Sequence, residues 1–130
     1  MVHILAPISA GELVDKITIL RIKQEKISVA AARANIEREL DELLRIRADA
    51  SLGVSAVAVL EEELLQVNRE LWDIENELRA REHDHDFGTR FIALARSVYR
   101  LNDRRNSLKK QVNALTGSVI VEEKSYAAYD

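Results

Sequence analysis

The sequence has no cysteine among its 130 residues, a single proline and only four glycines. The absence of cysteine excludes disulfide bonds, thiolate catalysis, and zinc or iron–sulfur sites built on cysteine. Aromatic residues make up only 5% of the chain, and sandwiches or barrels of short strands need more aromatic and turn residues than this. These shortages favour a helical protein.

The chain also lacks an excess of positive charge and long apolar runs. Its formal net charge is −3, so the composition does not support binding to nucleic acid or to an anionic membrane. No apolar run approaches the ~18 residues of a transmembrane helix, and the amino terminus does not resemble a signal peptide. We therefore expect a cytoplasmic protein. With 47% hydrophobic residues, residues 1–130 are expected to form one domain.

Apolar residues recur at spacings of three and four along most of the chain, which predicts helices. The expected helices cover residues 10–27, 29–50, 56–82 and 89–115. The third has the most regular pattern, typical of a coiled-coil-like seam. Its members are Val57, Leu60, Leu64, Val67, Leu71, Ile74 and Leu78.

The last two helices are joined by a short link, which predicts an antiparallel hairpin. Residues 55–86 carry ten acidic residues and three arginines, whereas residues 89–115 carry seven basic residues and one aspartate. An acidic helix beside a basic one supports the pairing. Because the apolar stripes of this hairpin are longer than two shorter helices can cover, the pattern also favours a homodimer.

The two ends of the chain contain the only segments with a preference for β-structure. These are residues 2–5 and residues 118–121. Neither has another partner for its backbone amides, so a two-stranded pairing of the ends would satisfy both. The predicted fold is therefore all-α, a four-helix arrangement with a long antiparallel hairpin, and the ends are expected to pair as short strands.

The stretch REHDHDFG, residues 81–88, places two histidines among carboxylates. Imidazole and carboxylate groups are ligands for zinc and similar ions. However, His83 and His85 are two residues apart at a helix end, so their rings point to different sides. The chain also has no glycine-rich phosphate loop or nucleophile elbow. We interpret this stretch as the hairpin corner, and we predict no metal and no cofactor.

Arg105 interrupts the apolar stripe of the last helix, at a position where a leucine is expected. An unpaired buried charge costs several kcal/mol, so the guanidinium must pair with an acid, reach solvent or bind an anion. Asn102 lies one turn before it, and Trp72 and Asp73 lie beside the seam of the opposite helix. Two interpretations remain open, an internal ion pair and an anion pocket.

The first expected helix begins with a capping box, in which Ser9 and Glu12 can hydrogen-bond each other's backbone amides. Glu12, Asp15 and Lys16 are spaced so that they share one face near the start of this helix. This face is either a charged solvent face or one wall of a polar pocket.

A short charged segment follows the last β-prone run. It is either a solvated tail or, if the chain ends pair, a second wall facing the Glu12 cluster. Its candidate binding residues are Glu122, Glu123, Lys124 and Tyr126.

Three stretches, PISAGELVDKITIL, LWDIENELR and DFGTRFIALARSVYRLNDRRNSLKKQVNALTGSVIVEEKSY, carry a resemblance to a known family. They resemble a bacterial family of domains of unknown function of about this length, and the similarity covers nearly the whole chain. The resemblance implies a self-contained domain and supplies no catalytic residue. The stretches contain Glu12, Asp15, Lys16, Trp72, Asp73, Asn102, Arg105 and the segment from Glu122 to Tyr126.

From these observations we expect a non-catalytic binding or assembly module for a protein partner or an anionic small molecule. The alternative is a small all-α enzyme acting on a phosphorylated or carboxylated metabolite. In that enzyme Arg105, Lys16 and Lys124 would hold the anion, and Glu12, Asp15 or Glu122 would be the acid and base. The two functions differ in whether these side chains converge on one pocket.

Overall fold

The computed structural model describes residues 1–130 and contains four helices and no strand. They are α1 (Ala10–Lys26), α2 (Ala30–Asp49), α3 (Ser55–His83) and α4 (Thr89–Thr116). The expected ranges differ from these bounds by at most one residue at each end. None of the helices combines the length and the hydropathy that a membrane span requires.

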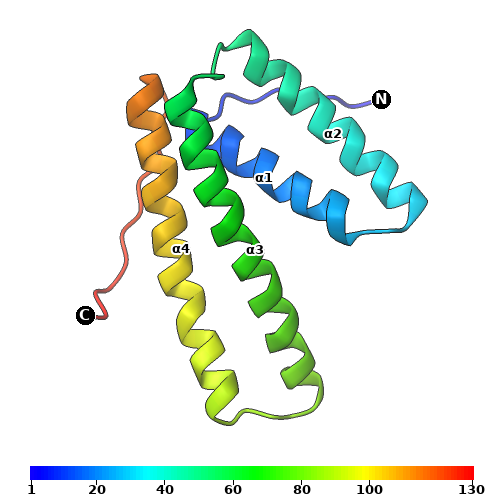
Figure 1. The fold of residues 1–130 in the computed structure, drawn as a ribbon, viewed down its shortest axis with the longest axis vertical. Coiled ribbons are helices and arrows are strands. Elements are labelled where there is room, and N and C mark those ends of the chain that lie inside the picture. Colours follow the sequence, from blue (N-terminus) through cyan, green and yellow to red (C-terminus); the bar gives the residue numbers. More distant parts are fainter.

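Helix α1 is the centre of the fold. Helices α3 and α4 form the predicted antiparallel hairpin, and α1 packs across one end of it (Figure 1). Helix α2 folds back along α1 and packs on no other helix, although its Arg47 forms an ion pair with Glu61 of α3. The lower part of the hairpin therefore extends beyond every other helix.

Two apolar clusters hold this arrangement, and each uses a different side of α1. The first joins Val14 of α1 to the hairpin, and its other members are Val57, Leu60, Leu64, Val67, Leu71, Leu108 and Val112. The second joins α1 to α2 and consists of Leu13, Ile17, Leu20, Ile36 and Leu40. Because α1 belongs to both clusters, its position fixes the whole fold.

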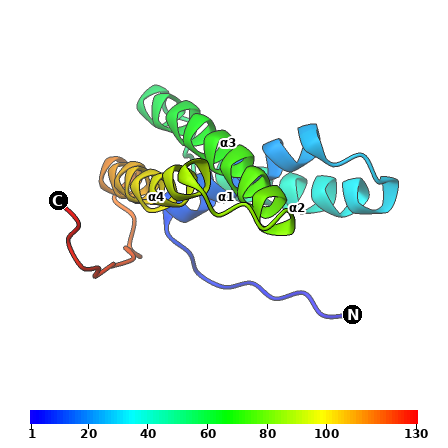
Figure 2. The same cartoon turned by 90° about the horizontal axis from the view of Figure 1, so that it is seen from below.

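The predicted pairing of the chain ends is wrong. Residues 2–5 and 118–121 form no backbone hydrogen bonds with each other, and the ends leave the helices on different sides (Figure 2). A two-stranded ribbon is marginally stable by itself. Here Ser118 contacts α1 instead, because its hydroxyl accepts a hydrogen bond from the Ala10 amide. The residues after it run beside α4 (Figure 1).

The REHDHDFG stretch is the hairpin corner, as predicted. Asp86 accepts hydrogen bonds from Arg81 and from the Gly88 amide, and these bonds stabilise the turn. His85 has a positive φ of 53°, and His83 lies beside Asp84 with both side chains in solvent. The histidines therefore form part of an exposed turn.

An ion-pair group next to this corner joins the two helices. The Glu77 carboxylate accepts hydrogen bonds from Arg90 of α4 and from Arg81 one turn along α3. The hydrogen bond from Arg90 is the main cause that lowers the pKa of Glu77 from 4.5 to about 2, with a contribution from Arg81 and against a smaller effect of burial.

Replacing Glu77 with glutamine is expected to remove a pH-dependent part of the stability. Since the pKa of Glu77 is lower in the folded state, the ion pairs stabilise the fold above pH 4.5 and are lost as the pH falls toward 2. The difference in melting temperature between the parent chain and Glu77→Gln should therefore shrink over this range. Melting curves from pH 6 to pH 2 test this, and a constant difference would contradict it.

Candidate functional site

The start of α1 lies directly against α4. The Gly11 amide donates to the Asn113 side-chain oxygen at 2.7 Å, and the Glu12 amide donates to the Ser9 hydroxyl at 3.0 Å. With the Ala10 amide bound by Ser118, every amide of this first turn has a partner. The amides at the positive N-terminal end of α1 are therefore all bound within the chain and are not available to an anion.

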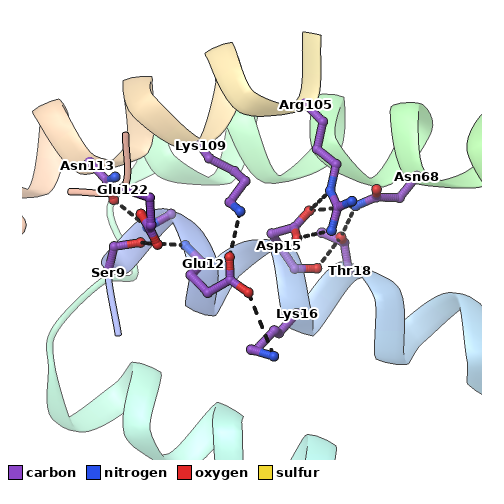
Figure 3. Close-up of polar contacts among 11 residues, drawn as sticks. Ser9, Glu12, Asp15, Lys16, Thr18, Asn68, Arg105, Lys109, Asn113 and Glu122 are labelled. Atoms are coloured by element: carbon purple, nitrogen blue, oxygen red, sulfur yellow. Dashed lines mark hydrogen bonds and ion pairs between the residues drawn. The ribbon is translucent and has the colours of Figure 1, made fainter. Parts of the chain in front are cut away.

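One turn further on, Arg105 of α4 reaches Asp15 of α1 (Figure 3). The guanidinium forms two parallel bonds, from Nε to Oδ1 at 2.9 Å and from Nη2 to Oδ2 at 2.5 Å. Asn68 of α3 donates to Asp15 Oδ1 and to the Thr18 hydroxyl. Asp15 is completely buried, whereas 28% of the Arg105 side chain is exposed.

This network compensates the charge of Arg105 within the chain. The hydrogen bond with Asp15 raises the pKa of Arg105, against the opposing effect of burial, so the guanidinium stays charged. The interpretation as an internal ion pair is confirmed, and the pair joins α1, α3 and α4. Because the arginine is partly exposed, it also contributes to the surface.

A second pair lies beside the first. Lys109, one turn after Arg105, binds Glu12 at 2.5 Å, and Lys16 approaches the other oxygen of Glu12 at 3.7 Å (Figure 3). The Ser9 hydroxyl accepts from the Glu12 amide as the capping box predicts, but the Glu12 carboxylate does not reach back to the cap. It turns toward α4, where Lys109 stabilises its charge.

The C-terminal segment joins the same region through Glu122. Its Oε2 accepts a hydrogen bond of 2.7 Å from the Ser9 hydroxyl. Burial raises the pKa of Glu122, but the bond from Ser9, a bond from its own backbone amide and the charge of Lys109 together outweigh it, so the net pKa is lowered. Glu122 is therefore an ionised anchor that holds the segment against the start of α1.

Beyond Glu122, the segment bends away from α4 and returns to it at Tyr129. The Tyr129 ring packs against Tyr99 with centroids 4.8 Å apart, and its hydroxyl donates to Asp103. That bond is the largest cause of a raised pKa for Tyr129. Arg100 lies over both rings and approaches Asp130 at 3.9 Å. The segment is thus fixed at both ends.

Between these two anchors lies an open groove of about 1130 Å³. One wall is the outer face of α4, the other is the C-terminal segment, and α1 contributes Glu12. The polar and aromatic side chains that line it are Glu12, Tyr99, Asn102, Asp103, Arg105, Asn106, Lys109, Lys124, Tyr126, Tyr129 and Asp130.

The structure places most of the residues singled out in the sequence at or near this groove. Those that line it are Glu12, Asn102, Arg105, Lys124 and Tyr126. Three more contact residues in or beside the groove: Asp15 binds Arg105, Lys16 approaches Glu12, and Glu122 accepts from Ser9. The remaining three, Trp72, Asp73 and Glu123, are not among its lining residues. Glu123 approaches Lys110 at 4.0 Å and is exposed.

Sequence reasoning missed several residues of this region. Lys109 follows Arg105 by four positions, a spacing that places both on one face of α4 and could have found it. Asn106 belongs to the same face. No pattern in the sequence indicates that Tyr129 returns to Tyr99, because that contact depends on the path of an irregular segment.

Comparison with protein-family models matches residues 4–129 to a family described as a family of unknown function, DUF6165. No curated protein and no solved structure matches the chain.

Proposed function

The chain belongs to this family of unknown function, and we propose that it is a binding module whose groove holds a small anionic molecule. The observation that carries the proposal is the convergence of Arg105 and Lys109 of α4 and Lys124 of the C-terminal segment on one groove. Such a concave site with a few fixed polar groups is typical of small-molecule binding.

Arg105 is held in a single orientation before any ligand arrives. Asp15 binds its Nε and Nη2, and the remaining nitrogen, Nη1, has no hydrogen-bond partner in the chain. A guanidinium that is already fixed loses little conformational entropy when it binds a carboxylate or a phosphate. Asp15 thus serves to position Arg105 in the lining of the groove.

Lys124 supplies a charge that no acid in the chain neutralises. It is exposed, lines the groove and forms no ion pair. Across from it, the side chains of Asn102 and Asn106 also have no hydrogen-bond partner. These amides can both donate and accept, so they would orient the uncharged part of a ligand.

The carboxylates favour binding over acid–base catalysis. Each one that lines the groove has a partner: Glu12 binds Lys109, Asp103 accepts from Tyr129, and Asp130 approaches Arg100. Glu122, at the edge, has a lowered pKa, whereas a general acid at neutral pH needs a raised one. These groups are therefore arranged to hold side chains in place.

The proposal predicts that anions stabilise the parent chain clearly more than they stabilise Lys124→Ala. Inorganic phosphate, pyrophosphate and citrate are the probes, followed by melting temperature. A ligand at 100 times its dissociation constant adds about 2.7 kcal/mol of stability. Loss of one charge-assisted contact should weaken binding about tenfold. Lys124 is suited to this test because its removal disturbs no ion pair of the fold.

The matched control is Lys26→Ala. Lys26 is an exposed lysine without an ion pair at the far end of α1, so this variant should respond to the anions like the parent chain. Equal stabilisation of all three chains would mean a general salt effect and would contradict binding in the groove. An absence of stabilisation by all three anions would also count against the proposal.

A further inference from the structure

The groove leaves Trp72, the single tryptophan of the chain, without a role. Asn68 marks the side of α3 that α1 covers, because its side chain binds Asp15 and Thr18. Trp72, Glu75 and Arg79 follow Asn68 at spacings of four, three and four, so they continue on the same side of α3. They follow Asn68 in the direction of the hairpin corner, and no other helix lies beside the corner end of the hairpin (Figure 1).

The same side of α4 is apolar. From Arg105, which also faces α1, residues spaced by three and four lead to Val98, Leu94 and Phe91. Leu94 is buried, but Val98 and Phe91 are only half-buried, as are Leu78 and Trp72 on α3. Val98 packs against the first apolar cluster, but no other helix lies beside the corner end of the hairpin (Figure 1), so the row remains partly open to water there.

The charges on this side would allow the faces of two copies to match each other. Glu75 and Arg79 are exposed, and neither forms an ion pair within the chain. If two copies meet across a two-fold axis that passes between these positions, Glu75 of each copy lies opposite Arg79 of the other. A surface that satisfies its own charges in this way is what a symmetric dimer requires.

We propose that a second copy of this chain docks on this face, which we call the Trp72 face: Trp72, Glu75, Leu78 and Arg79 of α3 with Phe91 and Val98 of α4. Half-buried apolar residues around a tryptophan, flanked by charges, match the core and rim of known interfaces. The face adjoins the groove, because Val98 lines both. The charges proposed to pair across the dimer, Glu75 and Arg79, are not among the groove's lining residues, so the two proposals are tested with different variants.

Trp72 itself reports the association in the unmodified chain. Dimerisation would remove its indole ring from water, so its fluorescence maximum should shift to shorter wavelength as the protein concentration rises. Sedimentation equilibrium over the same concentrations gives the mass. The expected result is that the shift and the monomer–dimer transition have the same midpoint.

Charge reversal tests whether the partner is a second copy in the proposed orientation. Glu75→Arg alone and Arg79→Glu alone each place like charges opposite each other in a homodimer, so each should weaken dimerisation about tenfold. An equimolar mixture of the two variants restores opposite charges at both contacts and should dimerise at least as well as the parent. Asp73→Arg, at an exposed position on the opposite side of α3, is the matched control.

A chain that stays monomeric up to millimolar concentration with a constant emission maximum would overturn the proposal. A dimer whose emission does not change, or whose mixed charge variants associate no better than each alone, would also overturn it, because the interface would then lie elsewhere. Circular dichroism of each variant confirms that the helices are retained, so that weaker association is not mistaken for unfolding.

Discussion

Replacing Gly11 with alanine is expected to destabilise the protein by about 3 kcal/mol, the upper range for overpacking. A Cβ at this position would overlap the carbonyl oxygen of Lys109 and lie 2.9 Å from the Asn113 side-chain oxygen. The carbonyl belongs to the backbone of α4 and cannot rotate away, so α1 and α4 must separate. Separation also weakens the hydrogen bond from the Gly11 amide to Asn113.

Chemical denaturation monitored by circular dichroism measures this loss. Gly53→Ala is the control, because a Cβ added there meets no atom within 4 Å. Its φ is also not positive, so alanine can adopt the same backbone. A change of less than about 1 kcal/mol in Gly11→Ala would show that the helices do not approach as closely as described.

The Arg105→Leu variant is expected to lose about 3 kcal/mol of stability. It leaves the Asp15 carboxylate completely buried with Asn68 as its one remaining side-chain donor. Breaking a buried pair from one side typically costs 3–5 kcal/mol, and partial exposure of the arginine places this site at the lower end. Asp15→Leu should cost less, since the freed guanidinium can turn into the groove.

The double variant, Asp15→Leu with Arg105→Leu, separates the charge effect from the loss of packing. Replacing both members of a buried pair with apolar residues is often neutral, so the double variant should regain most of what Arg105→Leu loses. Arg104→Leu is the matched control, because Arg104 forms a solvent-exposed pair with Glu63 that is worth less than about 1 kcal/mol. Equal losses of stability in Arg104→Leu and Arg105→Leu would contradict the description of Asp15 and Arg105 as a buried ion pair.

The helices could be predicted from the sequence because their apolar periodicity is a local property. The antiparallel hairpin also followed, since a short link leaves α3 and α4 no other arrangement, and their opposite charges agree with it. The prediction of strands at the two chain ends was wrong for a physical reason. β-Propensity in residues 118–121 counts only if a partner strand is available, and the Ser118 hydroxyl binds the Ala10 amide instead.

The candidate site was predictable only in part. Arg105 could be singled out because a charge in an apolar stripe must be compensated, but the identity of its partner could not. Asp15 is 90 positions away in sequence, and only the crossing of α1 over the hairpin brings the two together. Trp72 and Asp73 were grouped with the site because they adjoin the seam of α3, but α3 contributes no residue to the groove, which is lined by α4, α1 and the C-terminal segment.

The burial of Asp15 under α4 also determines the order in which the protein can assemble during synthesis. Chains emerge from the ribosome with the N-terminus first. When α1 and α2 have emerged, Arg105 and Asn113 have not yet been synthesised, so Asp15 and the Gly11 amide still have water as their partner. Helix α1 reaches its final position only after α4 is complete. Until then, the apolar side of α1 that faces the hairpin, including Val14, is exposed to chaperones and to neighbouring nascent chains.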